Sequence, residues 1–142
     1  MKQKIGVVLG ALVLASAHAV TGSTPAAAAD IFTFSVGRSV PGVTAILVSN
    51  ESMGREAGQA EWWQDPSGGL PGDTLAVSDH LADGYGIEAH LSTGRVATTR
   101  GHNSPYSTYK SGDLPEDHVY KMWVCVVKGS WQKCSSKIDV AS

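Results

Sequence analysis

The fold is decided by residues Met122–Cys134, with the sequence MWVCVVKGSWQKC, which is typical of two strands joined by a tight turn. Gly129-Ser130 predicts a two-residue hairpin loop in which glycine supplies the positive φ of a type II′ turn. With the tip placed there, Cys125 lies directly opposite Cys134, the only other cysteine of the chain. The spacing predicts a disulfide across the hairpin. A redox or metal-binding pair is the alternative, and the absence of further Cys or His ligands at zinc-like spacing argues against it.

The register of this hairpin beyond the cysteines stays open. Alternate residues of its first strand form an apolar set: Tyr120, Met122, Val124 and Val126. Direct extension of the hairpin pairs this set with polar residues: Asp139, Lys137, Ser135 and Lys133. Either the last strand is an edge strand that leaves the core, or a β-bulge shifts its register.

Upstream of the hairpin, the chain predicts more short strands separated by Gly and Pro turns. Residues 50–72 predict a long loop with one short strand at 61–64, and 101–112 predict a polar loop. No segment after residue 29 has a helical period. The sequence therefore predicts an all-β fold, an immunoglobulin-like antiparallel β-sandwich of about seven short strands. The expected strands are 31–36, 43–48, 74–78, 85–91, 95–100, 119–127 and 132–140.

The segment Leu114–Val124, LPEDHVYKMWV, resembles the turn that enters the penultimate strand of fibronectin type III and other immunoglobulin-like domains. In those domains a Leu and a Pro precede a Tyr whose hydroxyl bonds to the corner backbone, the tyrosine corner. The resemblance implies this role for Tyr120. It supports an architecture and implies no function.

A broader resemblance covers roughly the last 70 residues. It rests on residues 82–86 (ADGYG), 100–106 (RGHNSPY), 114–116 (LPE) and the terminal hairpin, which are similar to a family of small exported actinobacterial proteins. The resemblance implies that the protein is exported. Because the family is uncharacterised, it implies no catalytic or binding residue.

Residues 1–29 predict a secretory signal peptide. A basic start at Lys2 and Lys4 precedes the apolar run 5–14, and small residues follow, with A-x-A exits after Ala19 or Ala29. We favour Ala29, because Asp30 opens the first strand-like segment. The alternative, a membrane anchor, requires about 20 apolar residues, and polar residues interrupt this run too early. The expected mature protein is a secreted single domain of residues 30–142, with no membrane association after cleavage.

The charge of the chain bounds its partners. The 142 residues carry 11 Lys and Arg against 13 Asp and Glu, for a net charge of −2. Loss of Lys2 and Lys4 with the signal leaves nine basic residues and a net charge of −4. An acidic domain with no basic run does not favour binding to nucleic acid or to an anionic membrane. The expected partner is an extracellular polymer or protein.

Aromatic residues outside the predicted core are the best candidates for a binding site. Exposed aromatic side chains commonly form interaction surfaces, including stacking platforms for sugars. The alternative is that loop aromatics cover the thin core of a small sandwich, and we expect one of Trp62 and Trp63 to do so. The candidate ligand-binding residues are Trp62, Trp63, Tyr106, Tyr109 and Trp131.

These observations favour a secreted non-catalytic binding module without a cofactor. An inhibitor of an extracellular hydrolase, presenting the loop 103–109, and a small hydrolase are the alternatives. No nucleophile elbow, phosphate loop or paired carboxylates single out catalytic residues. The mature histidines, His80, His90, His102 and His118, are expected to be scattered on the surface rather than to bind metal. Asp79 and Asp83 are close enough in the chain to share a calcium site, although Asp-Gly is ordinary turn chemistry.

Overall fold

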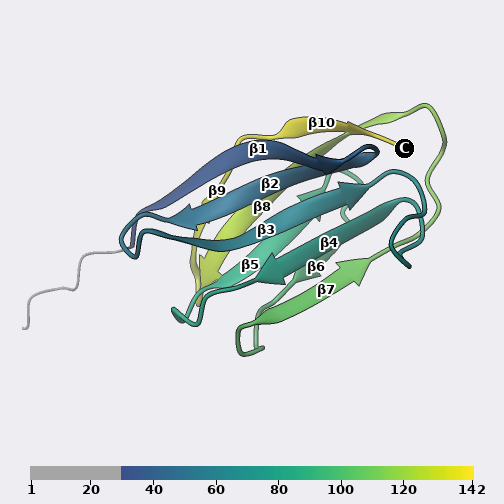
Figure 1. The fold of residues 1–142 in the computed structure, drawn as a ribbon. Helices are drawn as coiled ribbons and strands as arrows, with labels where there is room; N and C mark the ends of the chain where they lie inside the picture. Colours follow the sequence, from purple (N-terminus) through teal and green to yellow (C-terminus); the bar gives the residue numbers. More distant parts are fainter. Residues whose placement is uncertain (1–29) are drawn as a thin grey trace, which may run out of the picture.

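The computed structural model describes residues 30–142, which form two antiparallel β-sheets packed face to face (Figure 1). The predicted signal peptide lies outside the described residues. Described residues 30–142 contain no helix that is long and apolar enough to cross a membrane. The ten strands are β1 (Phe32–Val40), β2 (Val43–Asn50), β3 (Arg55–Trp63), β4 (Thr74–Asp79), β5 (Gly86–Leu91), β6 (Val96–Thr98), β7 (Tyr106–Lys110), β8 (Val119–Lys128), β9 (Trp131–Cys134) and β10 (Ile138–Ala141).

The predicted fold class, an all-β antiparallel sandwich, is confirmed, and its layers are compatible with an immunoglobulin-like domain. One sheet has the order β1-β2-β3-β4-β7, and the other has the order β10-β8-β5-β6 with β9 also paired to β8. The chain therefore changes sheet after β4, after β6 and after β7. Alternate loops consequently gather at opposite ends of the sandwich. We call the end with the β8–β9 turn the hairpin end, on the left in Figure 1, and the other the C-terminal end.

The strand count differs from the expected seven because two predicted loops contain strands. β3 occupies much of the long loop expected at 50–72, and β7 lies within the polar loop expected at 101–112. Neither sequence contains Val or Ile: REAGQAEWW has no β-branched residue, and YSTYK has only Thr108. Both are strands because neighbouring strands pair with them along most of their length. β3 pairs with β2 and with β4, and β7 pairs with β4. The third difference is that the last strand is divided into β9 and β10.

The predicted terminal hairpin is confirmed, both in the register of its strands and in its disulfide. Lys128 pairs with Trp131 and Cys125 pairs with Cys134, and Gly129 has the positive φ (56°) that the turn requires. The two cysteine sulfur atoms are 2.01 Å apart, as in a disulfide. The bridge therefore closes β8 onto β9 where the sequence predicts it.

The open question of the last strand is resolved by a bulge at residues 135–137. Val126 pairs with Lys133, but Met122 pairs with Ile138, so the pairing advances by one residue between β9 and β10. Ser135 bridges the shift: its amide donates to Val124 O at 2.9 Å, and its hydroxyl accepts from Val124 N at 3.1 Å. The shift turns Ile138 and Val140 toward the core in place of the polar residues.

The core lies between the two sheets, with Trp62 as one of its largest fully buried side chains. Trp62 is 1% exposed, and its indole Nε1 donates to Ala141 O at 2.7 Å. Other large buried side chains are Phe32, Ile46, Leu75, Ile87, Leu91 and Met122. At the corner before β8, Ser142 holds the chain: its amide donates to His118 O and its hydroxyl to Pro115 O. Tyr120 is half-buried against the core, and its tyrosine-corner role stays a prediction.

Candidate functional site

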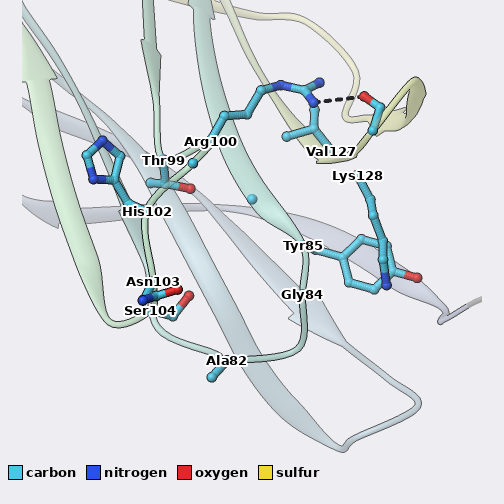
Figure 2. A pocket seen from close by; sticks show the side chains of 13 residues that line it. Ala82, Gly84, Tyr85, Thr99, Arg100, His102, Asn103, Ser104, Val127 and Lys128 are labelled. Atoms are coloured by element: carbon cyan, nitrogen blue, oxygen red, sulfur yellow. Dashed lines mark hydrogen bonds between the residues drawn. The ribbon is translucent and has the colours of Figure 1, made fainter.

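A hollow at the hairpin end has a volume of about 620 Å³ (Figure 2). Three loops far apart in the chain form it: the β4–β5 loop, the β6–β7 loop and the β8–β9 turn. We call it the hairpin-end pocket. Loops that are positioned by a rigid sheet are the usual carriers of binding sites in sandwich folds.

Tyr85 and Lys128 form one wall of the pocket. The Lys128 ammonium lies 4.4 Å from the centre of the Tyr85 ring, within the range of a cation–π interaction. Gly84 lies beside the ammonium, 3.5 Å from its Nζ at the position of a Cβ, and its φ of +80° favours glycine. The tyrosine ring thus holds a cation at the rim of the pocket.

Behind this wall an aromatic cluster joins the two sheets. The Tyr85 ring packs edge-on against Phe32 at 4.9 Å and against Trp131 at 5.5 Å. Edge-to-face packing at such distances is favourable beyond the burial of area. Trp131 remains 38% exposed, so the cluster reaches the surface beside the pocket.

Arg100 extends along the pocket toward the β8–β9 turn, where its Nη1 donates to Gly129 O at 2.9 Å (Figure 2). Its Nε also contacts Glu88 Oε1 at 2.6 Å, so a carboxylate offsets its charge. Thr98 Oγ1 donates to the same Glu88 oxygen at 2.9 Å. These contacts fix the β8–β9 turn relative to β5 and β6.

The opposite wall is polar and without acidic groups. It consists of His102, Asn103 and Ser104, which lie across the pocket from Tyr85 and Lys128 in Figure 2. The His102 ring stacks on Tyr106 with 3.8 Å between centres and 4° between planes. The amide of His102 donates to Thr99 O at 3.1 Å, which closes the turn after β6.

Next to this wall, the start of the β4–β5 loop buries an incompletely paired carboxylate. Asp79 is 3% exposed; its Oδ1 accepts from Leu81 N at 3.1 Å, and its Oδ2 has no hydrogen-bond partner among the described residues. Burial raises the pKa of Asp79, the nearby Ser104 hydroxyl and the Leu81 amide counteract this, and the Asp83 charge adds to the rise. Residues 30–142 contain no group of three or more His, Cys, Asp or Glu side chains that could hold a metal ion.

The structure separates the five predicted aromatic residues into three places. Tyr106 and Trp131 lie beside the pocket, on its His102 and Tyr85 sides. Trp63 and Tyr109 lie on the outer face of the first sheet, where Trp63 Nε1 donates to Glu61 Oε2 at 3.3 Å. Trp62 faces the core. The expectation that one of the two adjacent tryptophans covers the core is confirmed by Trp62, which is 1% exposed. Its edge lines a second pocket, of about 680 Å³, at the C-terminal end.

The hairpin-end pocket also contains residues that the sequence did not single out as ligand contacts: Tyr85, Arg100 and Lys128. Tyr85 is the first residue of the expected strand 85–91, and it is half-buried against the core. Lys128 is the last residue before the turn, a position where a lysine is unremarkable. The available signal was the pairing of Lys128 with Trp131, which puts a cation and an exposed indole at one hairpin tip.

The four histidines of residues 30–142 each have a different neighbour. His90, which stacks on Trp123, is partly buried, and burial lowers its pKa while the Glu88 charge opposes the shift. His80 and His102 both lie near the hairpin end, since Tyr106 pairs with Asp79, but residues 30–142 contain no group of three metal-ligating side chains. The contacts are His80 Nδ1 with Glu56 at 3.0 Å, His90 with Trp123, His102 with Tyr106, and His118 Nδ1 with Glu116 O at 2.8 Å.

Comparison with protein-family models, with curated proteins and with solved structures found no match for this chain. The resemblance to small exported actinobacterial proteins therefore stays a prediction, and the site is interpreted from its own geometry.

Proposed function

We propose that the protein is a secreted, non-catalytic binding module that takes a component of an extracellular polymer or protein into the hairpin-end pocket. The observation that carries the proposal is the convergence of three loops on one open hollow, with the Tyr85 ring on one side and the His102 ring on the other. Tyr106 and Trp131 were candidates from the sequence, and they lie beside this hollow from opposite directions. A concave site with few, well-placed polar groups and aromatic walls is the usual form of a ligand site.

The distribution of histidines and acids favours binding over hydrolysis. General acid–base catalysis needs a titratable group within hydrogen-bond reach of the reacting atoms. Of the four mature histidines only His102 lines the pocket, and no Asp or Glu lines it among the described residues. The inhibitor alternative is also less favoured, because residues 106–109 belong to β7, which pairs with β4 instead of forming a free loop.

The proposed location rests on the predicted signal peptide, and a disulfide is compatible with it. The Cys125–Cys134 bridge in the structure is of a kind that persists in oxidising compartments. Secretion is tested by the N-terminal sequence and mass of the protein recovered from the culture medium. A mature chain that begins at Asp30 or Val20 supports export, and an uncleaved chain in the cell contradicts it.

Binding at the pocket is tested by filling it. Asn103 is exposed on the pocket wall, so Asn103→Trp adds bulk over the opening at little cost to the fold. Ser111→Trp is the matched control, because Ser111 is exposed in the loop at the C-terminal end. We expect the wild type and Ser111→Trp to be retained on an insoluble extracellular polysaccharide, and Asn103→Trp to be released. Equal retention of both variants would place the ligand elsewhere.

A further inference from the structure

We propose that the hairpin-end pocket binds an acidic sugar unit, with the Lys128 ammonium as the contact for its carboxylate. This inference rests on the proposed function and names the class of ligand. The starting observation is the charge of the lining. Arg100, His102 and Lys128 line the pocket and no Asp or Glu does, in a domain whose net charge is −4. The lining itself is thus basic, although Glu88 pairs with Arg100 and Asp83 lies in the same loop as Tyr85.

Lys128 is the cation that remains available. In the part of the chain that the structure describes, Arg100 contacts Glu88 at 2.6 Å, whereas no carboxylate lies within 4.0 Å of Lys128 Nζ. The ammonium sits on the Tyr85 ring above Gly84. Because the ring holds the ammonium without neutralising it, the cation is positioned before a ligand arrives, which reduces the entropy lost on binding.

The opposite wall suits hydroxyl groups. The Asn103 amide and the Ser104 hydroxyl both donate and accept hydrogen bonds, and His102 adds a ring nitrogen. A simple anion would leave these groups unused, since they lie across the pocket from Lys128 (Figure 2). The volume of about 620 Å³ admits a ring with its substituents. A carboxylate at one edge of a polyhydroxylated ring satisfies both walls at once.

The net charge of the domain limits the ligand to one or a few acidic units. A long polyanion would be repelled by the acidic surface around the pocket. One ammonium–carboxylate pair near the surface also predicts a modest dependence of affinity on salt, smaller than for binding that uses many cations.

The test is an NMR titration of the mature protein at low salt with four probes: glucuronate, glucose, acetate and inorganic phosphate. The backbone amides of Gly84, Gly101 and Gly129 report on the pocket, because these residues line it. We expect glucuronate to shift them in a saturable way and the other three to bind at least about tenfold more weakly, since each lacks one half of the ligand. Equal binding of glucose overturns the role of the carboxylate, and equal binding of acetate or phosphate overturns the role of the ring.

The variants separate the charge from the shape of Lys128. Lys128→Met keeps the length and loses the charge, and we expect glucuronate to bind at least about tenfold more weakly. Lys128→Arg keeps the charge, and we expect a change within about threefold. Lys110→Met is the control, because it removes the same charge from the exposed end of β7. Undiminished binding by Lys128→Met, or an equal loss in Lys110→Met, overturns the proposal.

This experiment distinguishes the inference from the proposed function. If none of the four probes shifts the pocket amides while Asn103→Trp still abolishes retention on a polymer, the acidic-sugar assignment is overturned and the binding module stands. If glucuronate binds in a Lys128-dependent way but Asn103→Trp leaves polymer retention unchanged, the pocket assignment stands and its proposed use in polymer binding fails.

Discussion

The two ends of the sandwich use their cationic side chains in opposite ways. At the C-terminal end, Arg95 donates to Asp73 O and to Gly112 O, and its guanidinium lies 5.9 Å from the Trp62 ring. At the hairpin end, Lys128 lies beside an open pocket without a carboxylate partner among the described residues, and Asp79 Oδ2 is buried without a hydrogen bond. The cation at one end ties three loops together, and the cation at the other end has no carboxylate partner among the described residues. A buried carboxylate oxygen without a hydrogen bond lies at each end, Asp73 Oδ1 and Asp79 Oδ2.

This difference suggests that residues at the C-terminal end determine the stability of the domain and that residues at the hairpin end determine ligand binding. A network in which each polar group is paired rigidifies the chain, whereas unpaired groups cost stability and are retained where they serve another purpose. We therefore expect substitutions at the C-terminal end to change the free energy of unfolding most. Substitutions at the hairpin end should change binding more than stability.

The largest effect is expected for Trp62→Ala at the C-terminal end. The change removes a fully buried indole and leaves Ala141 O without its donor, so we expect the free energy of unfolding to fall by about 3–5 kcal/mol. Urea denaturation followed by tryptophan fluorescence measures it. Trp63→Ala is the matched control on the outer face of the sheet, with an expected loss below about 1 kcal/mol. Similar losses for both would contradict the placement of Trp62 in the core.

The disulfide is the strongest stabilising feature of the hairpin end. Replacing both cysteines, Cys125→Ala with Cys134→Ala, removes a short loop closure worth about 2.5–3 kcal/mol in the chain-entropy account. The bridge also holds the turn that carries Lys128 and Trp131, so we expect binding to weaken as well. Denaturation and the glucuronate titration of the double variant measure the two effects. A stable variant with full affinity would show that the turn holds its shape without the bridge.

The substitutions Arg95→Met at the C-terminal end and Arg100→Met at the hairpin end compare the contributions of the two arginines to stability. Arg95→Met removes two charge-assisted hydrogen bonds, one to the partly buried Asp73 O and one to the exposed Gly112 O, and we expect a loss of about 2 kcal/mol. Arg100→Met at the hairpin end removes a guanidinium whose side chain is 40% exposed, and its expected loss is below about 1 kcal/mol. Thermal unfolding of both variants tests the order. A larger loss for Arg100→Met would reverse the division of roles between the ends.

The sequence predicts the features that depend on local contacts, and it does not predict those that depend on the packing of the two sheets. The terminal hairpin is local, and its two-residue turn alone sets which residues face each other. The bulge at Ser135 depends on whether Ile138 and Val140 reach the core, which is a property of the packed sheets. β3 has too little β-propensity to be recognised without its neighbours. The pocket is least predictable, because Tyr85 and Lys128 meet only after the chain has changed sheet three times.

The smallest expected effect, a gain in stability, concerns the unpaired carboxylate of the hairpin end. Burial raises the pKa of Asp79 above its unfolded value of 3.8, so the ionised form is disfavoured in the folded protein. The contribution of Asp79 is therefore most favourable below the unfolded pKa and is lost as the pH rises through the folded one. Asp79→Asn keeps an acceptor for Leu81 N and removes the charge, and we expect it to stabilise the protein by about 1 kcal/mol at pH 7.

The gain from Asp79→Asn should shrink as the pH falls, because protonation removes the same charge from the wild type. Urea denaturation of both proteins between pH 3 and pH 7 measures this convergence. Asp113→Asn is the control, since Asp113 is an exposed carboxylate in the loop at the C-terminal end. A gain that is independent of pH, or an equal gain in the control, would mean that the buried charge is not what destabilises this end. If the gain follows the expected pH course and binding is unchanged, the carboxylate is a structural cost of the loop beside the pocket.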